Sequence, residues 1–241
     1  MRRVLKWLAG IVGLLALAAA TVFYVAFGKN SSIVDGQQIA PGVTSVKDGF
    51  VGIFVLDAGP GKVALVDAGN DKEGKAILAA LAKRSLTPAS VGAIFLTHGH
   101  PDHIAGCSLF PGADVYAMKA DLPLIGDSVK VTHPLNDGDV IEVAPELRVE
   151  AFATPGHTPG SAVYLAHGVL FFGDSAGASK EGTVMKAVSL FSKNSGQNVA
   201  SLRALEARLL PRAAEIKALA FAHTGPLATF QPLVDFASRS N

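Results

Sequence analysis

The stretch T-H-G-H-P-D-H, residues 97–103, places three of the chain's seven histidines beside an aspartate in one short loop. It follows directly on an apolar run, residues 93–97, that has the composition of a buried strand. Imidazole and carboxylate groups together bind zinc, iron and manganese. The motif therefore predicts a strand that ends in a metal-binding loop.

The two halves of this loop point to two metal ions. Gly99 has no side chain, so the backbone can bend sharply and aim His98 and His100 at one ion. Asp102 and His103 follow the loop's proline, which stiffens the chain and sends this pair in a separate direction. One loop cannot complete two sites, so further ligands must come from other segments.

Three further candidate ligands each follow an apolar, strand-like run and precede a turn: His157, Asp174 and His223. His157 lies in the rigid sequence T-P-G-H-T-P-G, Asp174 follows F-F-G, and His223 follows A-F-A. Ligands at the ends of rigid elements are held more precisely than ligands on long loops. We expect these side chains to meet the 97–103 loop.

From Gly42 onward, apolar runs typical of strands alternate with helical patterns. The predicted strands cover residues 52–57, 63–67, 93–97, 114–117, 139–143, 147–154, 162–165, 169–173 and 216–222. The predicted helices cover residues 72–85, 199–210 and 227–238, and residues 178–197 are predicted to form a loop over the metals. This mixed order predicts sheets covered by helices, with the chemistry at strand ends.

The pattern H-x-H-x-D-H, followed by an isolated histidine, a G-D and a final histidine, resembles the metallo-β-lactamase superfamily over about residues 40–230. The resemblance implies an α/β, four-layer αββα sandwich that binds two divalent metal ions, with zinc favoured and iron or manganese as alternatives. It implies that the first ion is bound by His98, His100 and His157. It implies that the second is bound by Asp102, His103 and His223, and that Asp174 bridges both. Asp67, in L-V-D-A-G, and Thr97 are expected to support the ligand loop.

Two neighbouring cations can share a hydroxide and lower its pKa toward neutrality, which removes the need for a serine or cysteine nucleophile. We therefore predict a metallo-hydrolase in which a hydroxide bridged by two metals cleaves a small ester, thioester or lactone. Asp102 and Asp174 are the predicted catalytic carboxylates.

Other functions stay open from the sequence alone. Asp174 argues against an antibiotic-hydrolysing β-lactamase, because the resemblance implies that those members usually lack a bridging carboxylate at this position. β-Lactam hydrolysis and phosphodiester hydrolysis are the alternative reactions. A metal-binding sensor without turnover and a di-iron oxidoreductase are the alternatives from other classes.

Lysine and arginine total 21 and aspartate and glutamate 20, so the net charge is +1, and no broad basic surface for nucleic acid is expected. The expected partner is a small-molecule substrate, and the sequence does not indicate an oligomeric state. The single cysteine, Cys107, cannot form an internal disulfide and is expected to be a packing residue. His133 and His167 lack the strand-end context and are expected to be structural.

The N-terminus carries Arg2, Arg3 and Lys6 ahead of an uncharged run over residues 7–27. As a helix the run would extend roughly 32 Å, close to the hydrocarbon thickness of a bilayer. We predict a membrane anchor over residues 1–28, a linker over 29–38 and a catalytic domain over 39–241. The positive flank favours a catalytic domain on the extracytoplasmic side. Cleavage of a signal peptide after the alanines at 18–20 is the alternative, and it would release a secreted protein.

Overall fold

The computed structural model describes residues 7, 11–14, 17, 21 and 28–239. The chain divides into two compact units, Met1–Asn30 and Ser31–Asn241. Both large sheets and the whole candidate site belong to the second unit.

The first sheet has seven strands in the order β1-β2-β3-β4-β5-β6-β7. Its strands are β1 (Gln38–Ala40), β2 (Val43–Asp48), β3 (Val51–Asp57), β4 (Val63–Val66), β5 (Val91–Phe95), β6 (Asp114–Met118) and β7 (His133–Leu135). The pairs from β1 to β4 are antiparallel, whereas β4 to β7 are paired in parallel. The carboxyl ends of β4 and β5 therefore lie at the same edge of the sheet.

The second sheet has six strands in the order β15-β14-β11-β10-β9-β8. They are β8 (Val140–Ala144), β9 (Leu147–Ala153), β10 (Ala162–Ala166), β11 (Val169–Phe171), β14 (Ala218–Ala220) and β15 (Leu227–Ala228). A separate hairpin pairs β12 (Ala176–Ala178) with β13 (Val184–Lys186). Strands β11 and β14 are parallel, and β9 runs in the same direction because β10 is antiparallel to both β9 and β11. The carboxyl ends of β9, β11 and β14 thus share one edge.

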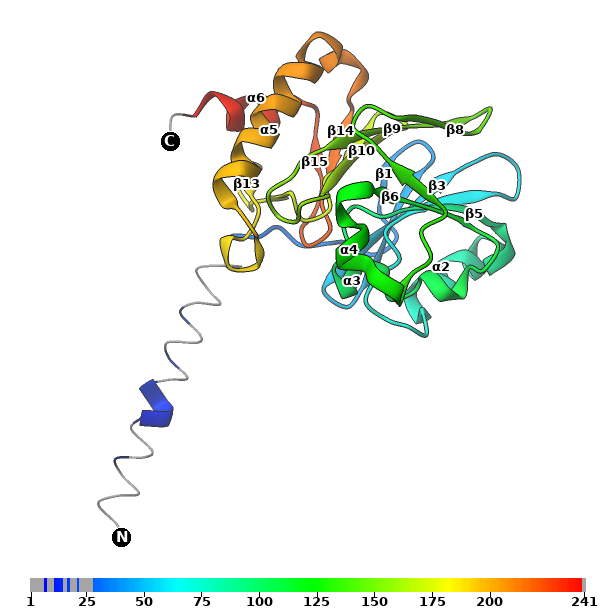
Figure 1. The fold of residues 1–241 in the computed structure, drawn as a ribbon, viewed down its shortest axis with the longest axis horizontal. Helices are drawn as coiled ribbons and strands as arrows, with labels where there is room; N and C mark the ends of the chain where they lie inside the picture. The colour runs from blue at the N-terminus through cyan, green and yellow to red at the C-terminus, as the bar shows by residue number, and fades with distance from the viewer. Residues whose placement is uncertain (1–6, 8–10, 15–16, 18–20, 22–27, 240–241) are drawn as a thin grey trace. The chain divides into compact units, whose positions relative to one another are not determined.

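The α-helices within residues 28–239 are α2 (Lys75–Lys83), α3 (Pro101–Ile104), α4 (Leu122–Ile125), α5 (Ser195–Leu209) and α6 (Gln231–Ser238). Short 3-10 helices are η1 (Pro88–Ser90), η2 (Cys107–Leu109), η3 (Lys119–Asp121), η4 (Gly126–Ser128), η5 (Ser189–Phe191) and η6 (Leu210–Glu215). In Figure 1, α2, α3 and α4 lie on the side of the first sheet, and α5 and α6 lie on the side of the second.

The layers follow from the alternation of side chains along buried strands. In β3, Phe54 and Leu56 face a core between the two sheets, and Ile53 and Val55 face a second core that includes residues of α2. Tyr164 enters the inter-sheet core from β10, while its neighbours in that strand face a third core with α5 and α6. Helix, sheet, sheet and helix therefore stack in the predicted αββα sandwich.

Two predicted elements differ from the observed ones for local reasons. Helix α5 begins at Ser195 rather than at residue 199, because the Asn194 side chain accepts a hydrogen bond from the Gln197 N–H and caps the helix. The predicted helix over residues 227–238 is wrong in its first part, which forms β15. Thr229 then adopts a φ of 64°, which a helix cannot accommodate, and α6 begins at Gln231.

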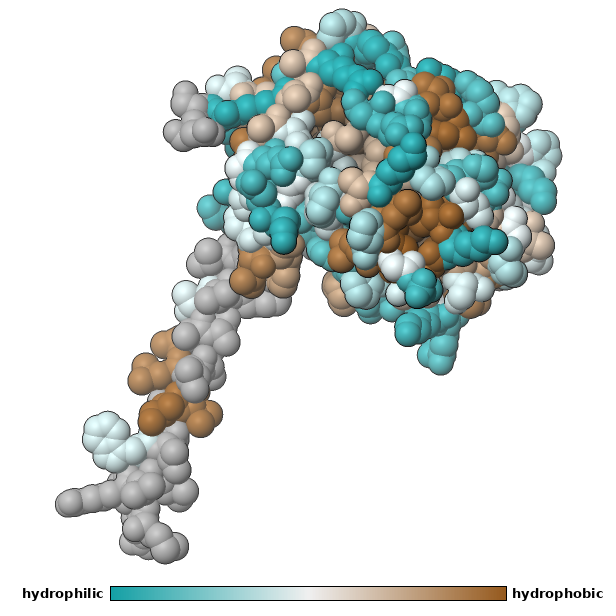
Figure 2. All heavy atoms as spheres, in the orientation of Figure 1, coloured by the Kyte–Doolittle hydropathy of each residue, from teal (hydrophilic) through white to brown (hydrophobic). Residues whose placement is uncertain are grey.

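The described positions of the first unit expose apolar side chains, coloured brown in Figure 2: Ile11, Val12, Leu14 and Leu17. Among residues 7, 11–14, 17, 21 and 28–239, no helix has the length and apolar character needed to cross a bilayer. The predicted anchor over residues 1–28 falls largely outside the described residues.

Candidate metal centre

Four strand ends carry the candidate ligands toward one another. The 97–103 loop follows β5, and His157, Asp174 and His223 follow β9, β11 and β14. Because the last three strands run in the same direction, their ligands emerge at one edge of the second sheet. The sandwich thus brings ligands from both sheets to a single centre.

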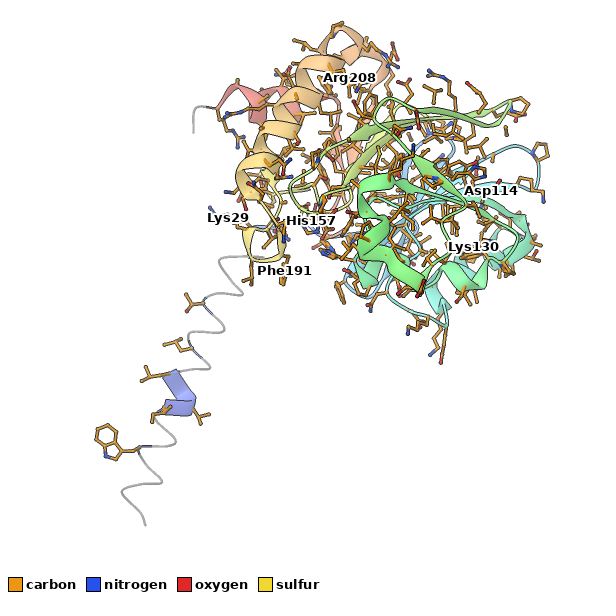
Figure 3. All side chains as sticks on the ribbon, in the orientation of Figure 1. Lys29, Asp114, Lys130, His157, Phe191 and Arg208 are labelled. Carbon is orange, nitrogen blue, oxygen red and sulfur yellow. The ribbon has the colours of Figure 1, made fainter. Side chains whose placement is uncertain are left out.

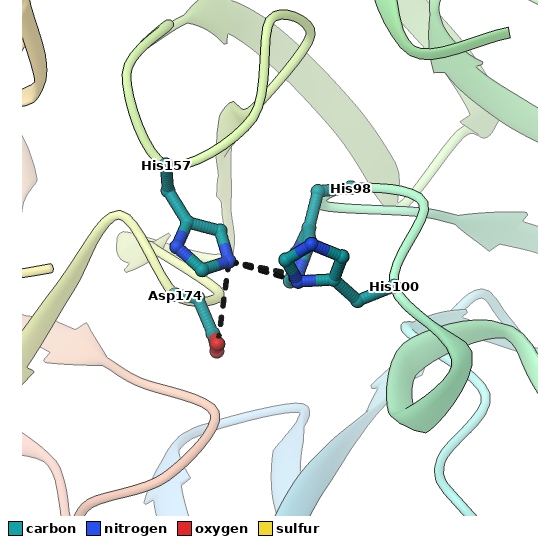
Figure 4. Close-up of side chains that lie close together, drawn as sticks. All are labelled: His98, His100, His157 and Asp174. Carbon is teal, nitrogen blue, oxygen red and sulfur yellow. Dashed lines mark hydrogen bonds and ion pairs between the residues drawn. The ribbon is translucent and has the colours of Figure 1, made fainter. Parts of the chain in front are cut away.

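The first cluster contains the three histidines predicted for the first ion (Figure 4). His98 Nε2 lies 3.0 Å from His100 Nδ1, and His157 Nε2 lies 3.2 Å and 3.1 Å from these two atoms. Asp174 Oδ2 lies 3.5 Å from His157 Nε2. The four ligand atoms lie within 4.8 Å of one another, a spacing that can surround one cation.

The second cluster contains Asp102, His103 and His223. Asp102 Oδ2 lies 3.7 Å from His103 Nε2 and 3.4 Å from His223 Nε2. The other oxygen of Asp174, Oδ1, lies 3.3 Å from His103 Nε2 and 3.1 Å from His223 Nε2. Asp174 therefore presents one carboxylate oxygen to each cluster.

Asp67 and Thr97 contact the Nδ1 atoms of His103 and His98, on the side of each ring that faces away from the centre. The buried Asp67 carboxylate lies 2.8 Å from His103 Nδ1 and accepts hydrogen bonds from the Thr97 N–H at 2.8 Å and the Thr97 hydroxyl at 2.8 Å. The same hydroxyl lies 3.1 Å from His98 Nδ1. These contacts leave the Nε2 atoms of both histidines facing the centre, which is the orientation a metal ligand needs. The structure thus places both residues in contact with the ligand histidines, and their supporting role stays a prediction.

Two further supports have no signal in the sequence. His157 Nδ1 lies 3.3 Å from the Ser192 hydroxyl, and His223 Nδ1 lies 2.9 Å from the Phe50 carbonyl oxygen. The Phe50 ring also stacks on His223, with ring centroids 5.7 Å apart. The segment 178–197, for which the sequence predicts a loop over the metals, instead contains β13, η5 and the first residues of α5. It reaches the site where the Lys193 N–H donates to the His157 carbonyl at 2.9 Å, and it carries Phe191 (Figure 3).

The two clusters differ in protonation. Burial lowers the pKa of His98 well below its usual value and lowers the pKa of His157 to about 4, so both rings are neutral and have a free lone pair. For His103 and His223, burial is outweighed by nearby carboxylates, which raise the pKa of His103 well above its usual value and that of His223 to about 10. In the same way, these histidines outweigh burial and lower the pKa of Asp174 well below its usual range.

The residues fit a bound cation on geometric grounds. His103 Nε2 and Asp174 Oδ1 are buried, and neither has a hydrogen-bond partner among the described residues. A tetrahedral zinc ion with nitrogen ligands at about 2.0–2.1 Å separates its ligand atoms by roughly 3.3 Å, close to the 3.0–3.2 Å between the first-cluster nitrogens. The structure thus brings all seven predicted ligands together in two adjoining clusters. Metal binding by these residues stays a prediction.

The remaining histidines and the cysteine lie outside both clusters. His133 is half exposed, stacks on Tyr116 and lies 3.2 Å from Asp114 Oδ1. His167 Nε2 lies 2.9 Å from the Asp57 carbonyl oxygen. Cys107 is buried in the core around α2, and burial raises the pKa of its thiol to about 12. None of the three contributes a ligand atom to either cluster.

Comparison with known proteins agrees with this arrangement. Residues 46–216 match the metallo-beta-lactamase superfamily. The hydroxyacylglutathione hydrolase of Salmonella paratyphi A is 39% identical over 127 residues, which make up 51% of this chain and 46% of that protein. The chain therefore spans about half the length of the curated relatives it matches.

Solved structures share the fold at low sequence identity. A metallo-beta-lactamase family protein from Thermus thermophilus is 24% identical, with a TM-score of 0.63 over 83% of this chain and 80% of that chain. BJP-1, a subclass B3 metallo-beta-lactamase of Bradyrhizobium japonicum, is 20% identical, with a TM-score of 0.61 over 88% of this chain and 93% of that chain. These likenesses establish the fold alone.

The chain belongs to the metallo-beta-lactamase superfamily, because the family match extends over residues 46–216 of its 241 residues. This membership confirms the predicted family.

Proposed function

We propose that this protein is a binuclear metallo-hydrolase that cleaves a small ester, thioester or lactone. The observation that carries the proposal is the position of Asp174. Its two carboxylate oxygens face different clusters, with Oδ2 toward His157 and Oδ1 toward His103 and His223. A carboxylate in that position can bind two cations at once and hold them at a short separation.

Each side of the centre has a distinct task in this proposal. His98, His100 and His157 would hold one divalent ion, and Asp102, His103 and His223 would hold the other. When bound, such ions supply Lewis acidity and an activated water nucleophile at neutral pH. Asp174 is 17% exposed, Asp102 22% and His223 25%, so these side chains line the face of the centre that a substrate can reach. Asp102 and Asp174 are the two carboxylates of the clusters, and we assign the catalytic role to them.

The choice of substrate class rests on the relatives. The hydroxyacylglutathione hydrolase of Salmonella paratyphi A is named for its action on an acylated glutathione, and this chain is 39% identical to it over 127 residues. A thioester is therefore the first substrate class to test. Zinc is the first metal to test, with iron and manganese as the alternatives.

We propose further that the catalytic unit, residues 39–241, functions on the extracytoplasmic side of a membrane. The support is the sequence alone, an uncharged run over residues 7–27 behind Arg2, Arg3 and Lys6. A phosphatase reporter that works only outside the cytoplasm, fused after Lys29, is expected to be active. Activity from a cytoplasmic reporter at the same position would reverse the orientation.

The main test uses the full-length chain, purified in mild detergent and loaded with zinc. We would measure turnover of an S-acyl glutathione, an acyl lactone, a β-lactam and a phosphodiester. Asp174→Asn is the test variant, and Asp235→Asn, at an exposed position in α6, is the matched control. Thioester or lactone turnover that is lost in Asp174→Asn and kept in Asp235→Asn supports the proposal. Turnover of the β-lactam or phosphodiester alone replaces the substrate class, and unchanged turnover in Asp174→Asn contradicts the binuclear centre.

A further inference from the structure

Asp121 is a buried acidic residue outside both ligand clusters. It ends η3, directly before α4, and its exposed fraction is 1%. Among residues 28–239, no basic side chain forms an ion pair with it. A buried carboxylate without a cationic partner is costly unless hydrogen bonds satisfy its oxygens, so its partners indicate why it is there.

Within residues 28–239, the hydrogen-bond donors to the Asp121 carboxylate all come from the two loops that carry the first cluster. Oδ2 accepts from the Gly99 N–H at 2.8 Å and from the Thr158 hydroxyl at 2.8 Å. Oδ1 accepts from the Gly160 N–H at 2.7 Å. Gly99 separates His98 from His100, and Thr158 directly follows His157. One carboxylate therefore joins the first-sheet loop to the second-sheet loop.

Both loops pack against the Asp121 segment without intervening space. A Cβ atom added at Gly160 would lie 2.3 Å from the Asp121 backbone nitrogen and 2.7 Å from its Cβ. A Cβ atom added at Gly99 would lie 2.8 Å from Cγ1 of Ile125 in α4. The two glycines permit this close approach, so the hydrogen bonds are direct and water does not bridge them.

We infer that Asp121 is a positioning residue that fixes the spacing of the three first-cluster imidazoles across the two sheets. The inference rests on the metal assignment in the proposed function. The second cluster has separate supports, since Asp67 holds His103 at 2.8 Å and the Phe50 carbonyl holds His223 at 2.9 Å. Asp121 should therefore govern metal binding at the first cluster and leave the second unaffected.

The substitution Asp121→Asn tests this role directly, because asparagine has nearly the same shape as aspartate but replaces one acceptor oxygen with an NH2 donor. Each oxygen of Asp121 faces a backbone N–H, that of Gly99 or that of Gly160. In either orientation of the asparagine side chain, its NH2 group would point at one of these donors, so one loop would lose its connection. Hydrogen bonds from groups behind the ligands typically change metal affinity by about 10–100-fold.

The experiment measures zinc affinity by competition with a chromophoric chelator, using full-length chains in which one cluster is removed. His223→Ala leaves the first cluster intact, and His157→Ala leaves the second. Asp121→Asn is expected to weaken zinc binding about 10–100-fold in the His223→Ala background. In the His157→Ala background it is expected to change zinc binding by no more than about twofold.

Thr158 provides a second, milder pair of variants. Thr158→Val removes one hydrogen bond to Asp121, and Thr158→Ser keeps the hydroxyl. We expect Thr158→Val to weaken first-cluster binding and Thr158→Ser to restore it, and this pair decides the matter if Asp121→Asn does not fold. Circular dichroism of the metal-free chains controls for folding.

The outcomes separate this inference from the proposed function. Equal weakening in both backgrounds would mean that Asp121 serves general stability, and unchanged binding at the first cluster would remove its positioning role. Either result leaves the binuclear proposal standing. Absence of zinc binding in both single-cluster backgrounds and in the wild-type chain would overturn the metal assignment itself, and with it both proposals.

Discussion

Replacing Asp67 with asparagine is expected to change which ring nitrogen of His103, a residue of the second cluster, carries the proton. Asp67 is fully buried and has a φ of 61°, a conformation that asparagine tolerates as well as aspartate, so the substitution adds no backbone strain. The carboxylate receives the Thr97 N–H at 2.8 Å on one oxygen and faces His103 Nδ1 at 2.8 Å with the other. The substituted amide has one acceptor for these two donors.

The consequence for His103 follows from the two possible amide orientations. If the NH2 group faces the Thr97 N–H, two donors meet in a buried place, which costs about 1–3 kcal/mol of folding free energy. If it faces His103, Nδ1 must accept that hydrogen bond and the ring proton moves to Nε2. Nε2 is the atom that faces the second cluster, at 3.3 Å from Asp174 Oδ1. To bind a metal through Nε2, the ring would have to lose that proton and protonate Nδ1 against the amide NH2 instead, so we expect zinc affinity at the second cluster to fall about 10–100-fold.

Three measurements test this expectation. Zinc content after dialysis should fall from two ions per chain toward one, and nitrogen NMR of His103 should report the Nε2–H tautomer. Urea unfolding of the metal-free chain should show the loss of about 1–3 kcal/mol. Asp235→Asn, the exposed control in α6, should match the wild type in all three. Two tightly bound zinc ions in Asp67→Asn would refute the argument that Asp67 controls the His103 tautomer.

Two further predictions follow from the charges. Without metal, the pKa of His223 is about 10, so this ring is protonated at neutral pH and a metal that binds it must displace the proton. The pKa of His157 is about 4, so this ring is already neutral and no proton has to leave it. Zinc affinity at the second cluster should therefore rise by about tenfold per pH unit for each displaced proton between about pH 7 and pH 9, and parallel profiles for the two clusters would contradict this. Glu150→Gln should lower the free energy of unfolding at pH 7 by about 1–3 kcal/mol, because Glu150 accepts two hydrogen bonds from Arg212, each of 2.8 Å. Hydrogen bonds from Arg212 lower the pKa of Glu150 from 4.5 to about 2, so this stabilisation is present above pH 4.5 and is lost as the pH falls toward 2. Urea titrations at both ends of that range should show the difference between wild type and variant disappearing in acid.

Four of the candidate ligands were predictable from the sequence because they share the same local sequence pattern. An apolar run stops, a histidine or aspartate follows, and glycine or proline begins a turn, as at His98, His157, Asp174 and His223. Because β9, β11 and β14 run in the same direction, their carboxyl ends lie at one edge of the second sheet, and the residues that follow them come together there. Continuous apolar runs likewise predicted most strands, since strands such as β3 and β10 are buried on both faces and composed almost entirely of hydrophobic residues.

The supporting contacts were not predictable, because they join residues that are distant in the sequence. Asp121 lies in the stretch K-A-D-L-P, which matches no ligand pattern, yet its partners are Gly99 and Gly160. Ser192 and Phe50 reach their histidines through a hydroxyl and a backbone carbonyl, groups that occur throughout any chain. Only the three-dimensional arrangement distinguishes these polar groups from others of the same kind. Asp67 was expected only through the family resemblance of L-V-D-A-G, and the structure places it after β4, which pairs with the strand of the ligand loop.

Each cluster takes its ligands from both sheets, and this affects how much folded protein a cell retains. In each cluster some ligands follow β5 of the first sheet and the others follow strands of the second. A bound cation is therefore a crosslink between the two halves of the sandwich, and these cannot separate without releasing it. Free metal at about 100 times its Kd adds about 2.7 kcal/mol to the free energy of unfolding. Metal scarcity is then expected to reduce the amount of folded protein, through unfolding and proteolysis, at the same time as it reduces turnover.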